Sequence, residues 1–175
     1  MRSDARANEA VRDATLEDAS AIGRLHVAAW QAAYAGIMGS AFLAGLDSRE
    51  REALWRERIA AGAHVLVAIE RGAVRGFACY GAERPDAPIP EVGELFAINL
   101  APDAWRRGIG ARLLAAVVGR LREAGFREGV LWVARENVGA RAFYERFGWH
   151  ADGGEKSDSG FGGPVVREVR YRTAL

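Results

Sequence analysis

One stretch, from Glu94 to Gly125, constrains the fold more than any other part of the chain. It reads as a strand, then a turn rich in arginine and glycine, then a long helix with one apolar stripe. This order puts free backbone N–H groups and the positive end of a helix dipole just beyond a strand end. Such a place stabilises a phosphate-bearing ligand. The stretch therefore predicts an α/β fold with an anion site at the turn.

Length and charge limit what surrounds this unit. At 175 residues the chain fits one domain, which we place at residues 9–175, after a polar and disordered tail at 1–8. The net charge is +1 with acids and bases interleaved, so no basic stripe predicts a nucleic acid partner. No apolar run resembles a signal peptide or approaches the ~20 residues of a membrane helix. We expect a cytoplasmic protein that binds no membrane.

Cysteine and histidine indicate no metal and no disulfide. Cys79 is the only cysteine and lies in an apolar strand-like run, so we expect a small core residue in a reducing compartment. His26, His64 and His150 are scattered without metal-ligand spacing, and we predict no metal site.

The remaining elements follow from changes of period. Ala10 to Ala14 reads as a strand, Thr15 with Asp18 resembles a capping box for a first helix, and Ser48 can cap a later helix. The next segments predict a hairpin with strands at 64–69 and 74–81, followed by a loop at 83–90 and a strand at 92–100. Beyond the glycine turn and its helix, a strand is expected at 129–134 and a helix from Asn137. The chain ends with a strand start at 149–152, a glycine-rich turn at 153–163 and a strand at 165–171. This order predicts a mixed sheet with helices on both faces, in which strands 92–100 and 129–134 are parallel.

The turn Arg106 to Gly110 does not fit two familiar phosphate loops. Ala111 and Arg112 stand where a Walker A loop needs lysine and serine or threonine. The dinucleotide fingerprint fails because its third glycine position is Leu113 and no acidic residue follows at the right place. A glycine-rich helix start that binds nothing remains an alternative for this motif taken alone.

Two runs remove much of that ambiguity. N-L-A-P-D-A-W-R-R-G-I-G-A-R-L-L and W-V-A-R-E-N-V-G-A-R-A-F-Y-E-R-F-G-W together resemble the GCN5-related N-acetyltransferase (GNAT) superfamily, and the resemblance extends over residues 10–171. It implies a mostly antiparallel central sheet of about six to seven strands, acetyl-CoA as cosubstrate, and acetyl transfer to an amine. In the family the turn is Q/R-x-x-G-x-G/A and wraps the pyrophosphate of acetyl-CoA; here Trp105 stands at its first position.

The resemblance assigns the cofactor residues. Main-chain groups of Ile98, Asn99 and Leu100 are expected to hold the pantetheine arm as an added strand would. Asn137 is expected both to cap its helix and to contact the cofactor. The pyrophosphate site is expected to comprise Trp105, Arg106, Arg107, Gly108, Ile109, Gly110 and Ala111.

Glu94 and Tyr144 are the predicted catalytic residues. Glu94 stands fourteen positions before Gly108, as does the glutamate general base of some family members. A paired or solvated strand-edge glutamate is the alternative reading. Tyr144 matches the family tyrosine that protonates the departing thiolate, and its alternative is a tyrosine whose ring only packs. Ala140, Phe143 and Phe147 are expected to form the buried stripe of that helix.

The acceptor side is less constrained. Trp30 and Tyr34, near the end of the first helix, and Phe96, on the face that alternation gives to Glu94 and Ile98, are the candidate acceptor residues. Core packing is an alternative for Trp30. We expect direct transfer to a primary amine of a small molecule or a peptide, and a homodimer is compatible with the family. A catalytically inactive acyl-CoA sensor is the alternative function.

Overall fold

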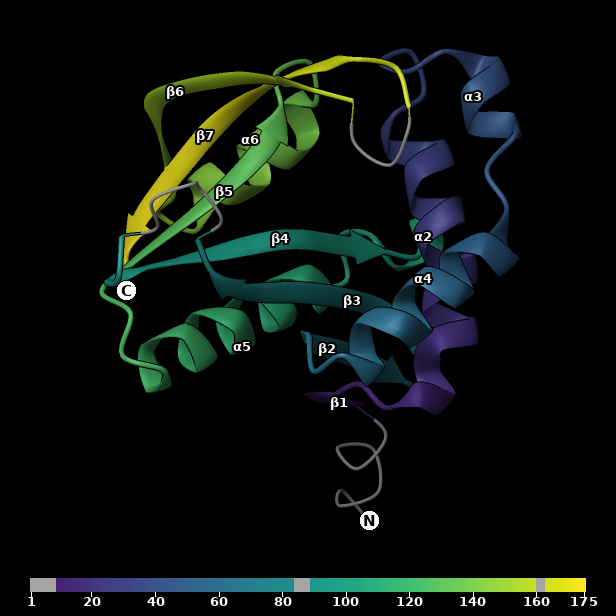
Figure 1. The fold of residues 1–175 in the computed structure, drawn as a ribbon, viewed down its shortest axis with the longest axis horizontal. Coiled ribbons are helices and arrows are strands. Elements are labelled where there is room, and N and C mark those ends of the chain that lie inside the picture. Colours follow the sequence, from purple (N-terminus) through teal and green to yellow (C-terminus); the bar gives the residue numbers. More distant parts are fainter. Residues whose placement is uncertain (1–8, 84–88, 160–162) are drawn as a thin grey trace.

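The computed structural model describes residues 9–83, 89–159 and 163–175. The expected tail at 1–8, most of the loop at 83–90 and part of the turn at 153–163 lie outside these residues. Figure 1 shows the strands as one twisted sheet with helices packed against it. The strands are β1 (Glu9–Asp13), β2 (His64–Glu70), β3 (Ala73–Ala82), β4 (Val92–Leu100), β5 (Glu128–Ala134), β6 (His150–Asp158) and β7 (Val166–Ala174). The helical segments are η1 (Leu16–Asp18), α2 (Ala19–Ala33), α3 (Ser40–Ala44), α4 (Ser48–Ala60), η2 (Pro102–Ala104), α5 (Ile109–Glu123) and α6 (Val138–Arg146).

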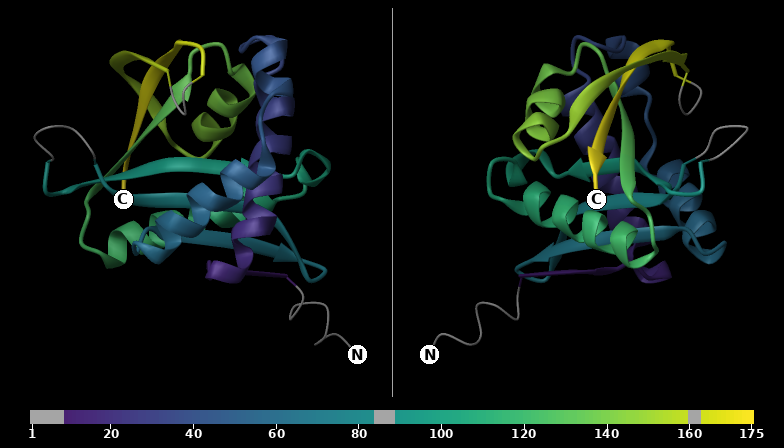
Figure 2. Two further views of the ribbon diagram at one scale, coloured as in Figure 1. Left: turned by 45° about the vertical axis from the view of Figure 1, so that its right-hand side comes forward. Right: turned by 90° about the vertical axis from the view of Figure 1, so that its left-hand side faces the viewer.

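The strands form one sheet in the order β1-β2-β3-β4-β5-β7-β6. Every neighbouring pair is antiparallel except β4 and β5, which are parallel and joined through α5. The predicted mixed, mostly antiparallel sheet with helices on both faces is therefore confirmed. In Figure 2, α2 and α4 lie over one face and α5 over the other.

Two apolar clusters hold these layers together. The predicted stripe of α5, made of Ile109, Leu113, Leu114, Val117 and Leu121, is at most 2% exposed and packs with Leu66, Leu95 and Leu131 of the sheet. On the other face, Ile22 and Leu25 of α2 and Trp55 of α4 pack on Phe77. Burial of an aliphatic or aromatic side chain of this size contributes about 1.5–3 kcal/mol relative to leaving it exposed.

Two predicted details are wrong. Asp47, not Ser48, is the N-cap of α4, because its carboxylate accepts a hydrogen bond from the Arg49 N–H at 2.7 Å. The predicted glycine-rich turn begins too early, since β6 continues to Asp158. A register shift between Ala151 and Glu155, with Gly153 at φ +89°, bends the strand and lets its pairing with β7 resume.

Candidate active site

A gap between β4 and β5 defines the site. The two strands pair from Val92 with Glu128 to Leu95 with Leu131, and no pair follows. Figure 1 shows the strands diverging beyond these residues. Ile98 and Asn99 of β4 lie beyond the segment that pairs with β5, so their main-chain groups on that edge can take up an extended ligand. Ile98, Asn99 and Leu100, the predicted pantetheine residues, lie on this segment and are partly buried.

The turn before α5 ends in a left-handed backbone. Arg106 has φ +60° and Gly108, the N-cap of α5, has φ +79°. The Gly108 carbonyl accepts from Arg112, so the N–H groups of Ile109, Gly110 and Ala111 precede the first intrahelical bond. A Cβ on Gly108 would meet no atom within 4 Å, so glycine is needed here for its φ, and the approach is open. These N–H groups and the helix dipole fit a pyrophosphate.

Gly110 serves packing rather than ligand approach. A Cβ at this position would lie 3.1 Å from Leu100 Cδ1 and 3.3 Å from the Phe143 ring. The absence of a side chain therefore lets the start of α5 fit between the end of β4 and α6. Gly108 is thus required for its positive φ, and Gly110 is required because the packing there leaves no room for a side chain.

Two side chains of the turn, those of Arg107 and Trp105, contact other parts of the protein. Arg107 lies 2.9 Å from the carboxylate of Glu70, whose side chain is only 10% exposed. The Trp105 indole N–H donates to the Leu100 carbonyl at 3.3 Å, so the side chain closes over the end of β4. That carbonyl belongs to the segment predicted to hold the pantetheine arm. Arg106 is exposed beside the turn.

Tyr144 is buried, at 7% exposure, and is surrounded by aromatic rings. Its ring centroid lies 5.4 Å from Phe143 and 6.4 Å from both Trp149 and Tyr171. Burial is the main cause of the raised pKa of this phenol, and the electrostatic interaction with the phenol of Tyr34 acts in the same direction. The predicted stripe of α6 is therefore wrong in part, because Phe147 is 43% exposed while Tyr144 takes the buried position.

Asn137 caps α6 as expected. Its side-chain oxygen accepts from the Ala140 N–H at 3.1 Å. The cap fixes the start of the helix that carries Tyr144, seven residues further on.

Glu94 lies where the gap begins. It pairs with Gly81 on β3 and with Val130 on β5, at the end of the paired segment, and is 6% exposed. The predicted shared face of Glu94, Phe96 and Ile98 is wrong at Ile98. Cys79 pairs with Ala97 and Tyr80 with Leu95, so Phe96 is an extra residue in the strand. Phe96 packs in the cluster of α2 and α4, whereas Ile98, after the irregularity, packs in the cluster of α5 with Leu95.

Trp30 and Tyr34, the predicted acceptor residues near the end of α2, have different positions in the packing. Trp30 is 8% exposed and packs with Met38, Leu43 and Val166, which makes it a core residue. Tyr34 caps the helix at the edge of this cluster, with its ring 5.0 Å from that of Trp30. Burial raises the pKa of Tyr34 to about 12, and the charge of Glu168 contributes to this rise.

Glu168 was not predicted. It lies on β7 opposite Ala134 of β5, and its carboxylate is 3.3 Å from the Lys156 ammonium. The alternation of β7 carried a signal, because Val169 and Tyr171 belong to the buried face and leave Val166, Glu168 and Arg170 on the other. Sequence alone did not reveal what that other face meets.

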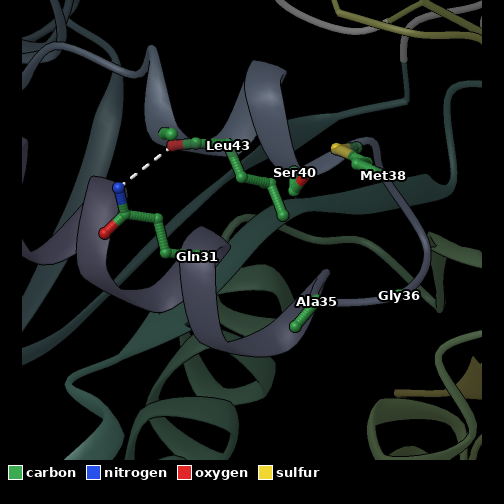
Figure 3. Close-up of a pocket in the computed structure, with 7 residues that line it drawn as sticks. Gln31, Ala35, Gly36, Met38, Ser40 and Leu43 are labelled. Carbon is green, nitrogen blue, oxygen red and sulfur yellow. Dashed lines mark hydrogen bonds between the residues drawn. The ribbon is translucent and has the colours of Figure 1, made fainter.

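An open cavity of about 460 Å³ lies between α2 and α3. Figure 3 shows Gln31 bonded to the Leu43 carbonyl, at 3.0 Å, on one wall of it. None of its lining residues is a predicted cofactor or catalytic residue. Its lining is Gln31, Ala35, Gly36, Met38, Ser40, Leu43 and Ala44.

The described residues contain neither a metal-binding cluster nor a membrane-spanning helix. Between residues 9 and 175, outside the gaps at 84–88 and 160–162, no three His, Cys, Asp or Glu side chains are grouped to hold a metal ion. In the same residues no helix has the length and apolar character to cross a membrane.

Comparison with known proteins identifies the family. The model of the acetyltransferase (GNAT) family matches residues 24–149. YuaI of Bacillus subtilis (strain 168), named an uncharacterized N-acetyltransferase, is 35% identical over 137 residues, 78% of each chain. The chain therefore belongs to the acetyltransferase (GNAT) family. It is an acetyl-CoA-dependent N-acetyltransferase.

Solved structures agree with this fold. A ribosomal-protein-alanine N-acetyltransferase from Brucella melitensis superimposes with a TM-score of 0.72 at 26% identity, over 95% of this chain and 99% of that one. A phosphinothricin acetyltransferase from Sinorhizobium meliloti, solved with acetyl-CoA, superimposes with a TM-score of 0.70 at 25% identity, over 96% of this chain and 89% of that one.

Proposed function

We propose that this enzyme acetylates a primary amine by direct attack on acetyl-CoA, with Glu94 as proton acceptor and Tyr144 as proton donor. The observation that carries the proposal is the gap between β4 and β5. Glu94 lies at its closed end, Tyr144 comes from α6 beyond β5, and the N-terminus of α5 lies beyond the end of β4. Bound acetyl-CoA would supply an activated thioester to this gap.

The backbone would hold the cosubstrate. The N–H groups of Ile109, Gly110 and Ala111 would donate to the pyrophosphate, and each hydrogen bond to a charged oxygen contributes roughly 1.5–3 kcal/mol. The helix dipole adds about 0.3–2 kcal/mol. Main-chain groups of Ile98 and Asn99 would orient the pantetheine arm, and Trp105 would keep the end of β4 in place.

Glu94 would help to free the lone pair of the acceptor. An alkyl amine with a pKa near ~10.4 is protonated at pH 7, and its deprotonation costs roughly 4–5 kcal/mol. A carboxylate within reach, directly or through one water, lowers this cost. Its buried position at the end of the paired segment would keep it close to the reacting atoms.

Tyr144 would protonate the departing thiolate. The raised pKa of its phenol keeps the proton on the oxygen at neutral pH. Most of the rate would come from holding amine and thioester together, where effective molarities reach ~10⁵–10⁸ M.

We propose a small-molecule amine as the acceptor, with a peptide amine as the second candidate. The net charge of +1 provides no field for a nucleic-acid-associated target. The two similar structures have names that point to both kinds, a ribosomal-protein alanine and phosphinothricin.

A screen of thiol release from acetyl-CoA across amine classes tests the proposal. The panel contains peptide N-termini, lysine, polyamines, aminoglycosides and amino-acid analogues. We expect turnover with one class, and loss of it in Glu94→Gln and Tyr144→Phe. Acetyl-CoA binding without thiol release from any amine would instead support a sensor.

We also propose a homodimer as the assembly. Light scattering behind size-exclusion chromatography measures the mass directly. A mass near 18.9 kDa, that of one chain, at all concentrations would contradict it.

A further inference from the structure

The face of β7 that turns away from α6 carries a second carboxylate toward the gap. Val166 of this face packs with Trp30, Met38 and Leu43, so the face lies toward the end of α2. Glu168 is the next residue on it and stands opposite Ala134, the last residue of β5, where β4 and β5 have already separated. Glu168 therefore lies on the β7 side of the same opening that Glu94 borders on the β4 side.

Ionisable groups from three elements, β6, β4 and the C-terminal end of α2, surround Glu168. Lys156 of β6 lies 3.3 Å from its carboxylate, 3.5 Å from Asp158 and 4.6 Å from the centre of the Trp132 ring. Glu94 of β4 and Tyr34 of α2 interact with it electrostatically. The Glu168 side chain remains 21% exposed, so it is partly desolvated and still accessible to a small molecule.

The balance of these effects favours a proton or a cation at Glu168. Burial raises the pKa of this carboxyl, Lys156 lowers it, and Asp158 and Glu94 raise it. Two carboxylates that repel each other across an opening gain most from a ligand that carries positive charge.

Further along the same face a carboxylate oxygen is unsatisfied. Glu83 is 7% exposed, and its Oε1 lies 3.5 Å from Arg170, the residue of β7 that follows Glu168 on this face. Its buried Oε2 has no hydrogen-bond partner among the described residues. An unsatisfied buried acceptor of this kind requires an explanation, and a ligand that brings N–H donors supplies one.

We propose that Glu168 is a second carboxylate of the acceptor site, which together with Glu94 binds the acceptor as an ammonium ion and accepts its first proton. This inference rests on the proposed function and adds a residue to it. The ammonium would lose one proton to Glu168 and then to solvent. As the C–N bond forms and the C–S bond breaks, the nitrogen would lose its second proton to Glu94, and Tyr144 would give one to sulfur. The acceptor class is therefore an alkyl amine that arrives as a cation.

The first test does not need turnover. Glutamate labelled with ¹³C at the carboxyl carbon gives the titration of Glu168 by NMR, assigned through Glu168→Gln. We expect a midpoint above the ordinary ~4.3. Glu94→Gln should lower the midpoint because a negative charge is removed, and Lys156→Met should raise it because a positive charge is removed. Added n-butylammonium should lower it more than NaCl at the same ionic strength.

The second test uses the acceptor found in the amine screen. Glu168→Gln should raise the KM for the amine about tenfold, leave the KM for acetyl-CoA unchanged, and alter the acidic limb of the kcat/KM profile. Glu155→Gln is the matched control, because Glu155 is an exposed glutamate of β6 paired with Arg135 at 3.4 Å.

The outcomes separate this inference from the proposed function. If no amine is acetylated, the proposed function fails, and the NMR titration still decides whether Glu168 faces Glu94 and an ammonium ion. A Glu168 midpoint that ignores both Glu94→Gln and n-butylammonium overturns the inference. So does a Glu168→Gln variant with the kinetics of Glu155→Gln in an active enzyme.

Discussion

At the scale of single residues, burial separates Tyr144 from its neighbours on α6. Helical periodicity gave the inward positions to Phe143 and Phe147, yet Phe147 is 43% exposed and Tyr144 is 7% exposed. A period of 3.6 residues states which residues share a face, but the helix packs at an angle that only its neighbours determine. Trp149, three residues beyond the end of α6, and Tyr171 of β7 pack around the phenol ring.

Tyr144→Phe tests this residue. The variant keeps the ring and removes only the proton donor, so kcat should fall about 10²–10⁴-fold. The KM for acetyl-CoA should stay within about twofold, because the contact energy lost in binding is small. Stopped-flow or steady-state thiol release measures both constants. Undiminished turnover with intact acetyl-CoA binding would remove Tyr144 from the mechanism.

Arg107 illustrates the opposite case, a predicted ligand whose charge is already paired. Since its guanidinium lies 2.9 Å from Glu70, Arg107→Ala should raise the KM for acetyl-CoA less than about fivefold. Gly108→Ala should have the larger effect, because alanine at φ +79° distorts the turn whose N–H groups would hold the pyrophosphate. Calorimetric titration with coenzyme A compares the two variants. A loss above ~50-fold in Arg107→Ala alone would mean that its side chain binds the phosphates directly.

At the scale of elements, the contact between α2 and α4 depends on a missing side chain. A Cβ on Gly23 would lie 2.6 Å from the Glu52 nitrogen and 2.7 Å from the Ser48 carbonyl oxygen. The two helices therefore approach backbone to backbone, which sets how α2 lies on the sheet and where its C-terminal end, with Tyr34, meets the gap.

Gly23→Ala should destabilise the protein by about 1–3 kcal/mol, because the helices must move apart. Gly119→Ala on α5 is the matched control, since a Cβ there would meet no atom within 4 Å. Alanine in that open helical position should stabilise by roughly 0.5–1 kcal/mol. Urea denaturation followed by tryptophan fluorescence measures both. Equal effects of the two substitutions would contradict the close approach.

At the scale of the whole molecule, His26 makes folding stability depend on pH. It is 2% exposed between α2, α4 and the sheet, and its Nδ1 accepts a hydrogen bond from the Trp55 indole at 2.9 Å. Burial, together with the positive charges of Arg51 and Arg58, lowers its pKa from 6.5 to about 3. A protonated ring could not accept the Trp55 hydrogen bond.

The direction of this pH dependence follows from the number of protons that the folded and the unfolded chain bind. Between pH 6.5 and about 3 the unfolded chain binds a proton at His26 that the folded chain does not. Stability from this group is therefore complete above pH 6.5 and is lost as pH falls, by at most about 1.4 kcal/mol per unit. Between pH 7 and 5 the loss should approach about 2 kcal/mol.

The variant His26→Asn tests this dependence, because asparagine offers an acceptor oxygen that does not titrate. Its free energy of unfolding should be lower than that of the wild type at pH 7 and should change less between pH 7 and 5. Urea titrations at the two pH values give the comparison. An unchanged pH slope in the variant would assign the acid sensitivity to other groups.

The order of elements, the stripe of α5 and the glycine turn before it were determined by the sequence alone. Each depends on contacts between residues a few positions apart, such as the burial of Ile109 with Leu113 or the φ that Gly108 permits. The family motif added candidate roles for Glu94 and Tyr144.

Only the tertiary structure decided the details that depend on a distant partner. Phe96 is an extra residue in β4 because the register of β4 against β3 shifts between the Tyr80–Leu95 and Cys79–Ala97 pairs. Glu70 pairs with Arg107 from another strand, and β6 stays extended because β7 continues to pair with it. Glu168 meets the gap because β7 lies beside β5. Strand pairing joins residues far apart in the chain, and local periodicity carries no information about which strands become neighbours.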